Sequence, residues 1–242
     1  MADKYEQFVR WYLRFNGYLA IENFVIHRPD GSGVPQGGEI DILSVRFPFS
    51  REDVTSQDFD PTRIQKDSRL LSDPRFGGRV DFILAEVKSK NAAVNDIWRV
   101  TDTTNEKAAK VAYILRWLGA FKNESTIMQV SEDLQQHHVA FHGRYCFRVL
   151  CFAKTKSQQA VPPSIQQITF QEIAEFIVKV RTQCWIQAGL GVHSQHPQWD
   201  EMILRIWKLG DPKRAGSSEE KIRNIAEYLE SFSVSTEKSS RR

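Results

Sequence analysis

The spacing of hydrophobic residues predicts a helix at the start of the chain. Large apolar side chains recur there at intervals of three and four residues: Tyr5, Phe8, Val9, Tyr12 and Leu13. Asp3 can cap the first turn of this helix, because its carboxylate can accept hydrogen bonds from free backbone N–H groups. Gly17 can adopt the left-handed conformation that follows many helix ends. We therefore expect an amphipathic helix that ends shortly before Gly17.

The pattern after this helix is typical of strands. An extended apolar run covers 18–27, and residues 39–45 begin with a strict alternation of polar and apolar side chains. Residues 80–87 are almost all apolar as far as Glu86, which predicts a central strand covered on both faces. A fourth strand is expected at 145–153, where aromatic and β-branched residues are frequent.

Helical patterns dominate the second half of the chain. An apolar stripe from Ala108 to Leu118 predicts a helix between the third and fourth strands in the chain. Thr169 and Glu172 have the spacing of a capping box, and two further apolar stripes follow, one after Trp199 and one after Ser217. The last part of the chain is thus expected to be helical.

These elements predict an α/β fold with a helical addition. We expect a core at 1–160 that contains a long polar insertion at about 47–79. Pro162-Pro163 marks the one plausible boundary, so 161–232 is expected to form a helical C-terminal extension. The Ser-rich end, 233–242, is expected to be a flexible tail.

Composition limits the function classes without selecting one. The 242 residues are 41% hydrophobic, which supports a folded core, and no run is long and apolar enough to predict a membrane span. The chain has three cysteines, an odd number that leaves one unpaired in any disulfide scheme and suggests a reducing compartment. Its first residues are charged where a signal peptide would be apolar, so we expect a cytoplasmic protein. The net charge of +3 permits a nucleic-acid partner but does not indicate one.

Three charged residues sit at strand positions next to core residues. Asp41 lies in the second expected strand, and Glu86 and Lys88 lie on one face at the end of the third. A charge beside a core is costly unless it is paired or binds a metal. If the two strands are neighbours, the two carboxylates and the Val87 carbonyl form a set of hard oxygen ligands suited to Mg²⁺. Lys88 could then stabilise negative charge on a phosphate group.

These residues resemble the PD-(D/E)xK, or restriction endonuclease-like, nuclease superfamily. The resemblance rests on Asp41 and on the Glu86-Val87-Lys88 triplet, and it covers roughly 1–154. It implies a core of order α-β-β-β-α-β with a mixed central sheet flanked by helices. It also implies that Asp41 and Glu86 bind Mg²⁺, with Mn²⁺ as a substitute, and that Lys88 is the catalytic lysine. By the same resemblance, Glu6 matches a first-helix glutamate that supports the metal site.

Glu6, and Glu39 two residues before Asp41, each have an ordinary structural interpretation beside the functional one. Glu6 stands three residues after Asp3 and can complete a capping box, which explains it without catalysis. Glu39 shares a strand face with Asp41, so it could add a metal ligand or lie in solvent at the mouth of the strand.

The sequence thus predicts a divalent-metal-dependent endonuclease that hydrolyses phosphodiester bonds, with DNA as the expected substrate. The alternative is a catalytically inactive nuclease-fold subunit that binds nucleic acid or assembles into a restriction, repair or defence complex. A homodimer or a larger complex stays open.

Trp98 and Trp117 are expected in the core. The candidates for phosphate contacts are basic residues near the expected site: Lys88, Lys90, Arg99, Lys107 and Lys110.

Overall fold

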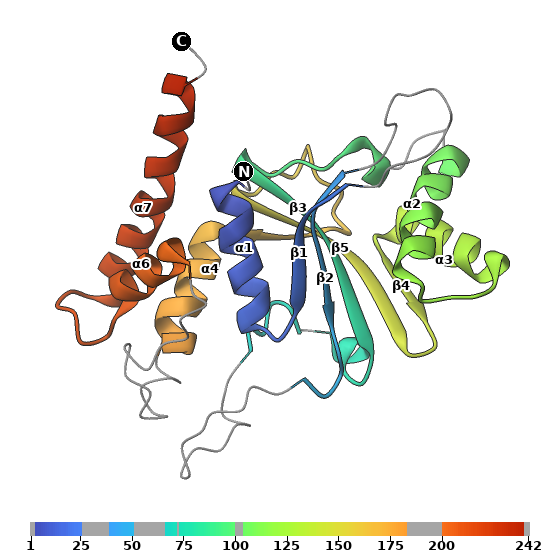
Figure 1. The fold of residues 1–242 in the computed structure, drawn as a ribbon, viewed down its shortest axis with the longest axis horizontal. Helices are drawn as coiled ribbons and strands as arrows, with labels where there is room; N and C mark the ends of the chain where they lie inside the picture. The colour runs from blue at the N-terminus through green and yellow to red at the C-terminus, as the bar shows by residue number, and fades with distance from the viewer. Residues whose placement is uncertain are drawn as a thin grey trace.

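A mixed β-sheet lies between two groups of helices in the computed structural model, which describes residues 3–25, 39–50, 66–71, 73–99, 104–182 and 200–239 (Figure 1). The helices on one side are α1 (Lys4–Phe15), α4 (Phe170–Phe176), α6 (Glu201–Gly210) and α7 (Ser218–Ser239), and those on the other side are α2 (Thr104–Leu118) and α3 (Glu124–His137). This arrangement confirms the predicted α/β class.

The sheet has six strands within the described ranges. They are β1 (Leu19–Val25), β2 (Glu39–Arg46), β3 (Val80–Asn91), β4 (Val139–His142), β5 (Tyr145–Thr155) and β6 (Gln166–Thr169). Their order is β1-β2-β3-β5-β4, and β6 also pairs with β5. The first three strands are antiparallel, whereas β5 runs parallel to β3 and is reached through α2 and α3. The strands expected at 39–45, 80–87 and 145–153 are all confirmed, with β3 four residues longer than predicted.

The first helix forms as the sequence predicts. The backbone N–H of Tyr5 donates to the Asp3 carboxylate at 3.1 Å, and Gly17 takes a φ of +86° just past the helix end. The buried face of α1 packs on the sheet through Phe8, Tyr12 and other residues of its apolar stripe. Because this packing fixes α1 on β2 and β3, the position of Glu6 on its first turn is fixed as well.

The central strand separates two hydrophobic clusters. Ile83 and Ala85 face the cluster that contains α1, while Leu84 faces the cluster that contains α2 and α3. All three side chains are fully buried, so the prediction of a strand covered on both faces is confirmed.

Three elements were not predicted. Helix α3 buries Ile127, Val130 and Leu134 on one face, a helical spacing that the surrounding polar residues obscure. Strand β4 has only four residues and belongs to a hairpin closed by Gly143 and Arg144. Strand β6 buries a single apolar side chain, so its sequence carries no alternation, and its pairing with β5 holds it in the sheet.

The residues expected to form the helical C-terminal extension include one strand and pack against α1. Strand β6, at the start of 161–232, is part of the sheet. Phe170 and Ile206, from α4 and α6, pack in the same hydrophobic cluster as α1. Helix α7 continues to Ser239, through most of the segment 233–242 that we expected to be a tail, because no Gly or Pro interrupts it.

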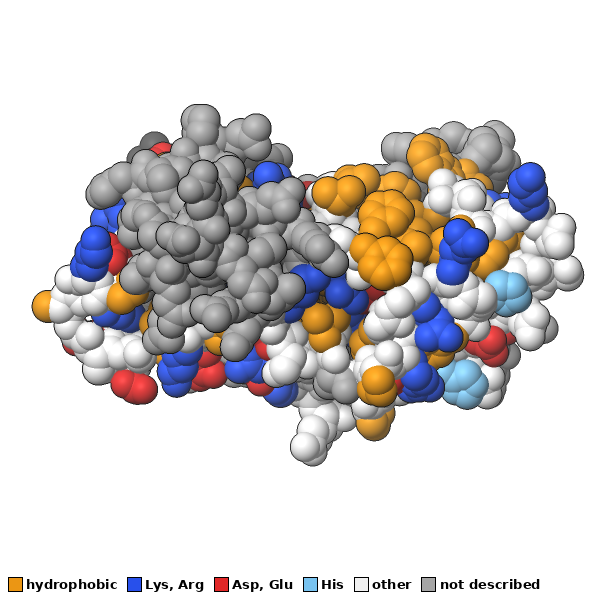
Figure 2. All heavy atoms as spheres, turned by 90° about the horizontal axis from the view of Figure 1, so that it is seen from below, with side chains coloured by type: hydrophobic (Ala, Val, Ile, Leu, Met, Phe, Trp, Pro, Cys, Tyr) orange, Lys and Arg blue, Asp and Glu red, His pale blue; other side chains and the backbone are white. Residues whose placement is uncertain are grey.

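Exposed apolar side chains occur on the edge strand β1 and elsewhere. Leu19 and Ile21 alternate with less exposed residues on β1, and Phe49 and Trp117 are also exposed. Figure 2 shows hydrophobic side chains gathered on the face seen there, with Lys and Arg side chains beside them. Across the described ranges, every helix is too short or too polar to cross a membrane.

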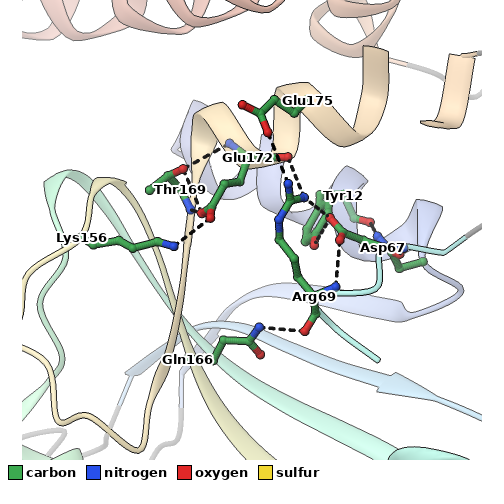
Figure 3. A network of polar contacts seen from close by, with 9 residues as sticks. Tyr12, Asp67, Arg69, Lys156, Gln166, Thr169, Glu172 and Glu175 are labelled. Carbon is green, nitrogen blue, oxygen red and sulfur yellow. Dashed lines mark hydrogen bonds and ion pairs between the residues drawn. The ribbon is translucent and has the colours of Figure 1, made fainter. Parts of the chain in front are cut away.

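The end of the predicted insertion is anchored in the core by a polar network (Figure 3). The buried carboxylate of Asp67 accepts hydrogen bonds from the Tyr12 hydroxyl at 2.9 Å and from Arg69 Nη1 at 2.8 Å. Arg69 also donates to the backbone carbonyl of Glu172, and its own carbonyl accepts a bond from Gln166 at 2.7 Å. The network therefore ties the insertion to α1, α4 and β6 together.

Removing the centre of this network should destabilise the whole fold. Asp67→Ala leaves the tyrosine hydroxyl and the guanidinium without their buried partner, and we expect the free energy of unfolding to fall by about 3 kcal/mol. Tyr12→Phe removes one donor only and should cost about 1 kcal/mol. Urea unfolding followed by circular dichroism measures both. Glu227→Ala, which breaks an exposed pair with Arg223 on α7, serves as the control and should change little. An Asp67→Ala protein as stable as this control would contradict the anchoring role.

Candidate active site

The candidate site lies where β2 and β3 separate. The backbone pairing of the two strands runs from Arg46 opposite Asp81 to Ile42 opposite Ala85. Before Ile42, β2 continues beside β1 alone. The Asp41 side chain bridges the resulting fork, because its Oδ2 accepts a 2.6 Å hydrogen bond from the backbone N–H of Val87. A carboxylate is thus held between the two strands at the point where the ladder ends.

The backbone of the neighbouring strand is distorted at the same level. Asn23 of β1 has a φ of +51° and stands between residues paired with Ile40 and Ile42. The left-handed region is uncommon for residues other than glycine, and asparagine tolerates it better than most. Ile42 packs in the cluster on the α1 side, whereas Ile40 packs in the cluster on the opposite side. The regular alternation of β2 therefore changes at Asp41.

The structure brings Asp41, Glu86 and Lys88 together. Lys88 Nζ lies 3.2 Å from Asp41 Oδ2 and 3.0 Å from Glu86 Oε2, so one ammonium group lies within contact of both carboxylates. The other oxygen of Glu86 accepts a 3.0 Å hydrogen bond from the indole N–H of Trp98. The Glu86 residue is fully buried, while about a third of the Lys88 side chain remains exposed. The cluster therefore reaches solvent on its lysine side.

Burial and mutual charge shift the pKa values in this cluster. Burial raises the pKa of Glu86, and the positive charge of Lys88 offsets only part of this effect. Burial alone would lower the pKa of Lys88, but the two carboxylates outweigh it and the pKa is raised. The lysine consequently keeps its proton at neutral pH and carries the only positive charge within contact distance of both acids among the described residues.

Glu6 lies near Asp41, on the first turn of α1. Burial and, to a smaller extent, the negative charges of Asp41 and Asp3 together raise its pKa to about 7. A hydrogen bond from the backbone of Asp3 acts in the opposite sense, so Glu6 does take part in capping the helix. Its Oε2 atom is buried and has no hydrogen-bond donor among the described residues. The structure thus places Glu6 both at the helix cap and beside the acidic cluster.

The donor chemistry fits a hard divalent cation. In the described part of the chain, no three or more His, Cys, Asp or Glu side chains are placed to hold a metal ion. The predicted ligand set needs only two carboxylates, from Asp41 and Glu86, because its third member is the backbone carbonyl of Val87. Both carboxylates share a single ammonium as their positive partner. A cation bound at this fork would offset the negative charge that Lys88 leaves uncompensated on the two carboxylates.

Trp98 is the residue that sequence reasoning placed in the core without a role at the site. It is buried as predicted, but its indole N–H bonds directly to Glu86. A signal was available, since a buried tryptophan normally finds an acceptor for its N–H group. Trp117, in contrast, is 64% exposed, so its predicted core position is wrong. It lies at the end of α2, where its ring contacts Phe24 edge-on across the gap to β1.

The basic residues expected near the site differ in exposure. Lys90, Arg99 and Lys110 have exposed side chains, as a phosphate contact requires. Lys107 is buried instead, and its ammonium donates to the Arg99 carbonyl at 3.0 Å, so the structure places it in a local support role. The side chain of Glu39 lies outside the described residues.

Comparison with known proteins adds no family to this picture: no family model, curated protein or solved structure matches the chain.

The raised pKa of Glu6 makes stability depend on pH. Between pH 4.5 and about 7 the folded protein keeps a proton on Glu6 that the unfolded chain releases. The free energy of unfolding should therefore fall as the pH rises through this window, and Glu6→Gln should flatten the decline. Urea unfolding at several pH values, with a chelator present, tests this. Glu227→Gln, a change at an exposed glutamate of α7, should keep the wild-type slope. Identical slopes in Glu6→Gln and the wild type would contradict the assignment.

Proposed function

We propose that the protein is a Mg²⁺-dependent nuclease that hydrolyses phosphodiester bonds in DNA. The observation that carries the proposal is the cluster at the fork between β2 and β3, in which the buried carboxylate of Glu86 and the mostly buried carboxylate of Asp41 share one lysine. Hydrophobic packing gives no reason to bury such a cluster, and isolated buried acids are costly. Groups of this kind with shifted pKa values occur preferentially at functional sites.

The order of the elements supports the same function. Helix α1 precedes three antiparallel strands, a helical crossover through α2 and α3 follows, and β5 then pairs parallel with β3. This order is compatible with the restriction endonuclease-like core, with α3 and β4 as additions. The contacts of Lys88 with Asp41 and Glu86, from the second and third strands, support this comparison.

Each residue has a distinct role in the proposed reaction. Asp41 and Glu86 would hold the ion together with the Val87 carbonyl, and Glu6 would support them from α1. The bound ion supplies a water of lowered pKa and neutralises charge on the phosphate. Lys88 keeps its proton at neutral pH, so its ammonium can donate hydrogen bonds to the negative charge that develops on the phosphate oxygens. Lys90, Arg99 and Lys110 would contact the DNA backbone.

A plasmid-nicking assay tests the proposal. With Mg²⁺ or Mn²⁺ present, the wild type should convert supercoiled plasmid to the nicked form. Asp41→Asn keeps an oxygen for the Val87 N–H but removes the charge, and activity should fall at least about 100-fold. Lys88→Ala should lose roughly 100- to 1,000-fold, the usual effect of removing a donor that stabilises a transition state. Lys154→Ala, at a half-exposed lysine of β5 that pairs with Glu230, should retain full activity.

The outcomes separate the proposed enzyme from an inactive relative. Equal nicking by the wild type, Asp41→Asn and Lys88→Ala would refute the site. Calorimetric titration with Mn²⁺ should show binding by the wild type and its loss in Asp41→Asn. Binding of Mn²⁺ with no cleavage of plasmid, branched or single-stranded DNA would favour the non-catalytic alternative and overturn the proposed activity.

A further inference from the structure

The carboxylate of Glu86 has two oxygens with different partners. Oε1 accepts the hydrogen bond from the Trp98 indole N–H at 3.0 Å, and Oε2 lies 3.0 Å from the Lys88 ammonium. Both Glu86 and Trp98 are almost completely buried, at 0% and 1% exposure. A rotation that turned the carboxylate plane away from the indole would leave the N–H without an acceptor in a buried setting, which is unfavourable. The tryptophan therefore fixes the plane of the carboxylate, so that one oxygen meets the indole and the other faces the fork.

Trp98 is itself held in place by contacts remote from the fork. It ends the short 3₁₀ helix η3 (Asp96–Trp98), which connects β3 to α2. Its carbonyl lies 2.7 Å from His138 Nε2. Because a carbonyl can only accept, this ring nitrogen must carry the proton.

The other side of the histidine ring is also engaged. In the neutral ring, Nδ1 then accepts from the Ser164 hydroxyl at 2.6 Å. Burial lowers the pKa of His138, in keeping with the neutral form. His138 is the C-cap of α3 and has a φ of +60°, so the backbone of Trp98 is hydrogen-bonded to the end of a helix.

We propose that Trp98 is a positioning residue for Glu86: its indole N–H anchors one carboxylate oxygen so that the other is presented to Lys88 and to a divalent cation. This inference rests on the proposed function, because it assigns the presented oxygen to metal binding. Partners that orient a metal ligand in this way typically account for a 10- to 100-fold difference in metal affinity. His138 acts one step further out, through the Trp98 backbone.

The test compares two tryptophan-to-phenylalanine variants that lose the same kind of bond. Trp98→Phe keeps the buried ring but deletes the N–H that bonds Glu86. Trp11→Phe deletes an indole bond of 2.9 Å to the carboxylate of Asp200, outside the fork, from a tryptophan that is just as buried. Calorimetric titration with Mn²⁺ should show about 10- to 100-fold weaker binding for Trp98→Phe and wild-type binding for Trp11→Phe. Circular dichroism checks that both variants are folded.

A second measurement remains decisive if Trp98→Phe does not fold. The wild type has six tryptophans, whose indole N–H signals can be followed by NMR while Mg²⁺ is added. The Trp98 signal, assigned by selective labelling, should shift on addition of Mg²⁺ more than the Trp11 signal. An unchanged Trp98 signal in a protein that binds Mg²⁺ would overturn the positioning role.

The failure of this inference can be told apart from the failure of the proposed function. A wild type that binds no Mn²⁺ would overturn both. If the wild type binds Mn²⁺, Asp41→Asn does not, and Trp98→Phe binds with unchanged affinity, the proposed site stands and only the role of Trp98 is overturned. Equal weakening in Trp98→Phe and Trp11→Phe would show a general effect on stability and would also overturn that role.

Discussion

The cost of burying the Glu86 carboxylate shapes the arrangement around the candidate site. A buried acid needs compensating charge and hydrogen bonds, and Glu86 sits in the middle of the central strand, just past its last pair with β2, with no solvent access. Lys88 supplies the charge, Trp98 supplies a hydrogen bond, and Asp41 shares the same ammonium. The separation of β2 from β3 gives these groups room, because the Asp41 side chain replaces backbone pairing at that level.

The same strand carries a second buried acid, and the contrast between the two is informative. Asp81, near the start of β3, accepts hydrogen bonds from Arg148 and from the Tyr18 hydroxyl, and Arg46 lies 3.6 Å away. Two guanidinium groups thus surround one carboxylate, which suits a permanent structural role. Further along β3, two carboxylates share one ammonium. The two ion clusters of this strand therefore differ in their balance of positive and negative charge.

The elements that could be predicted are those in which hydrophobic residues follow one helical or strand spacing without interruption. The apolar stripe that includes Phe8 predicted α1, and the continuous apolar run before Glu86 predicted the central strand. Strand β6 could not be found in this way, because its place in the sheet comes from β5 and not from its own side chains. The C-terminal helices show a similar limit. Periodicity predicts that Leu229 lies on the apolar face of a helix, but it does not tell that this face packs in the same cluster as α1.

The candidate site was predictable in part for a related reason. Strand alternation placed Glu86 and Lys88 on one face, and the antiparallel pairing of β2 and β3 then brought Asp41 to them. At the level of the fork, Asn23 of β1 has a left-handed backbone, and a pattern within β2 or β3 does not contain this feature. The contact of Trp98 with Glu86 arises from the connection after β3, where no regular period operates.

The way the insertion is closed has a consequence for how this fold can vary. Lys66 Nζ donates to the Ser50 carbonyl at 3.1 Å, so the chain that leaves β2 and the chain that leads to β3 are joined by a direct contact. The entropy of closing a loop grows only slowly with its length once its ends are fixed. The entropic cost of closing the chain between Ser50 and Lys66 would therefore change little with the number of residues that join them.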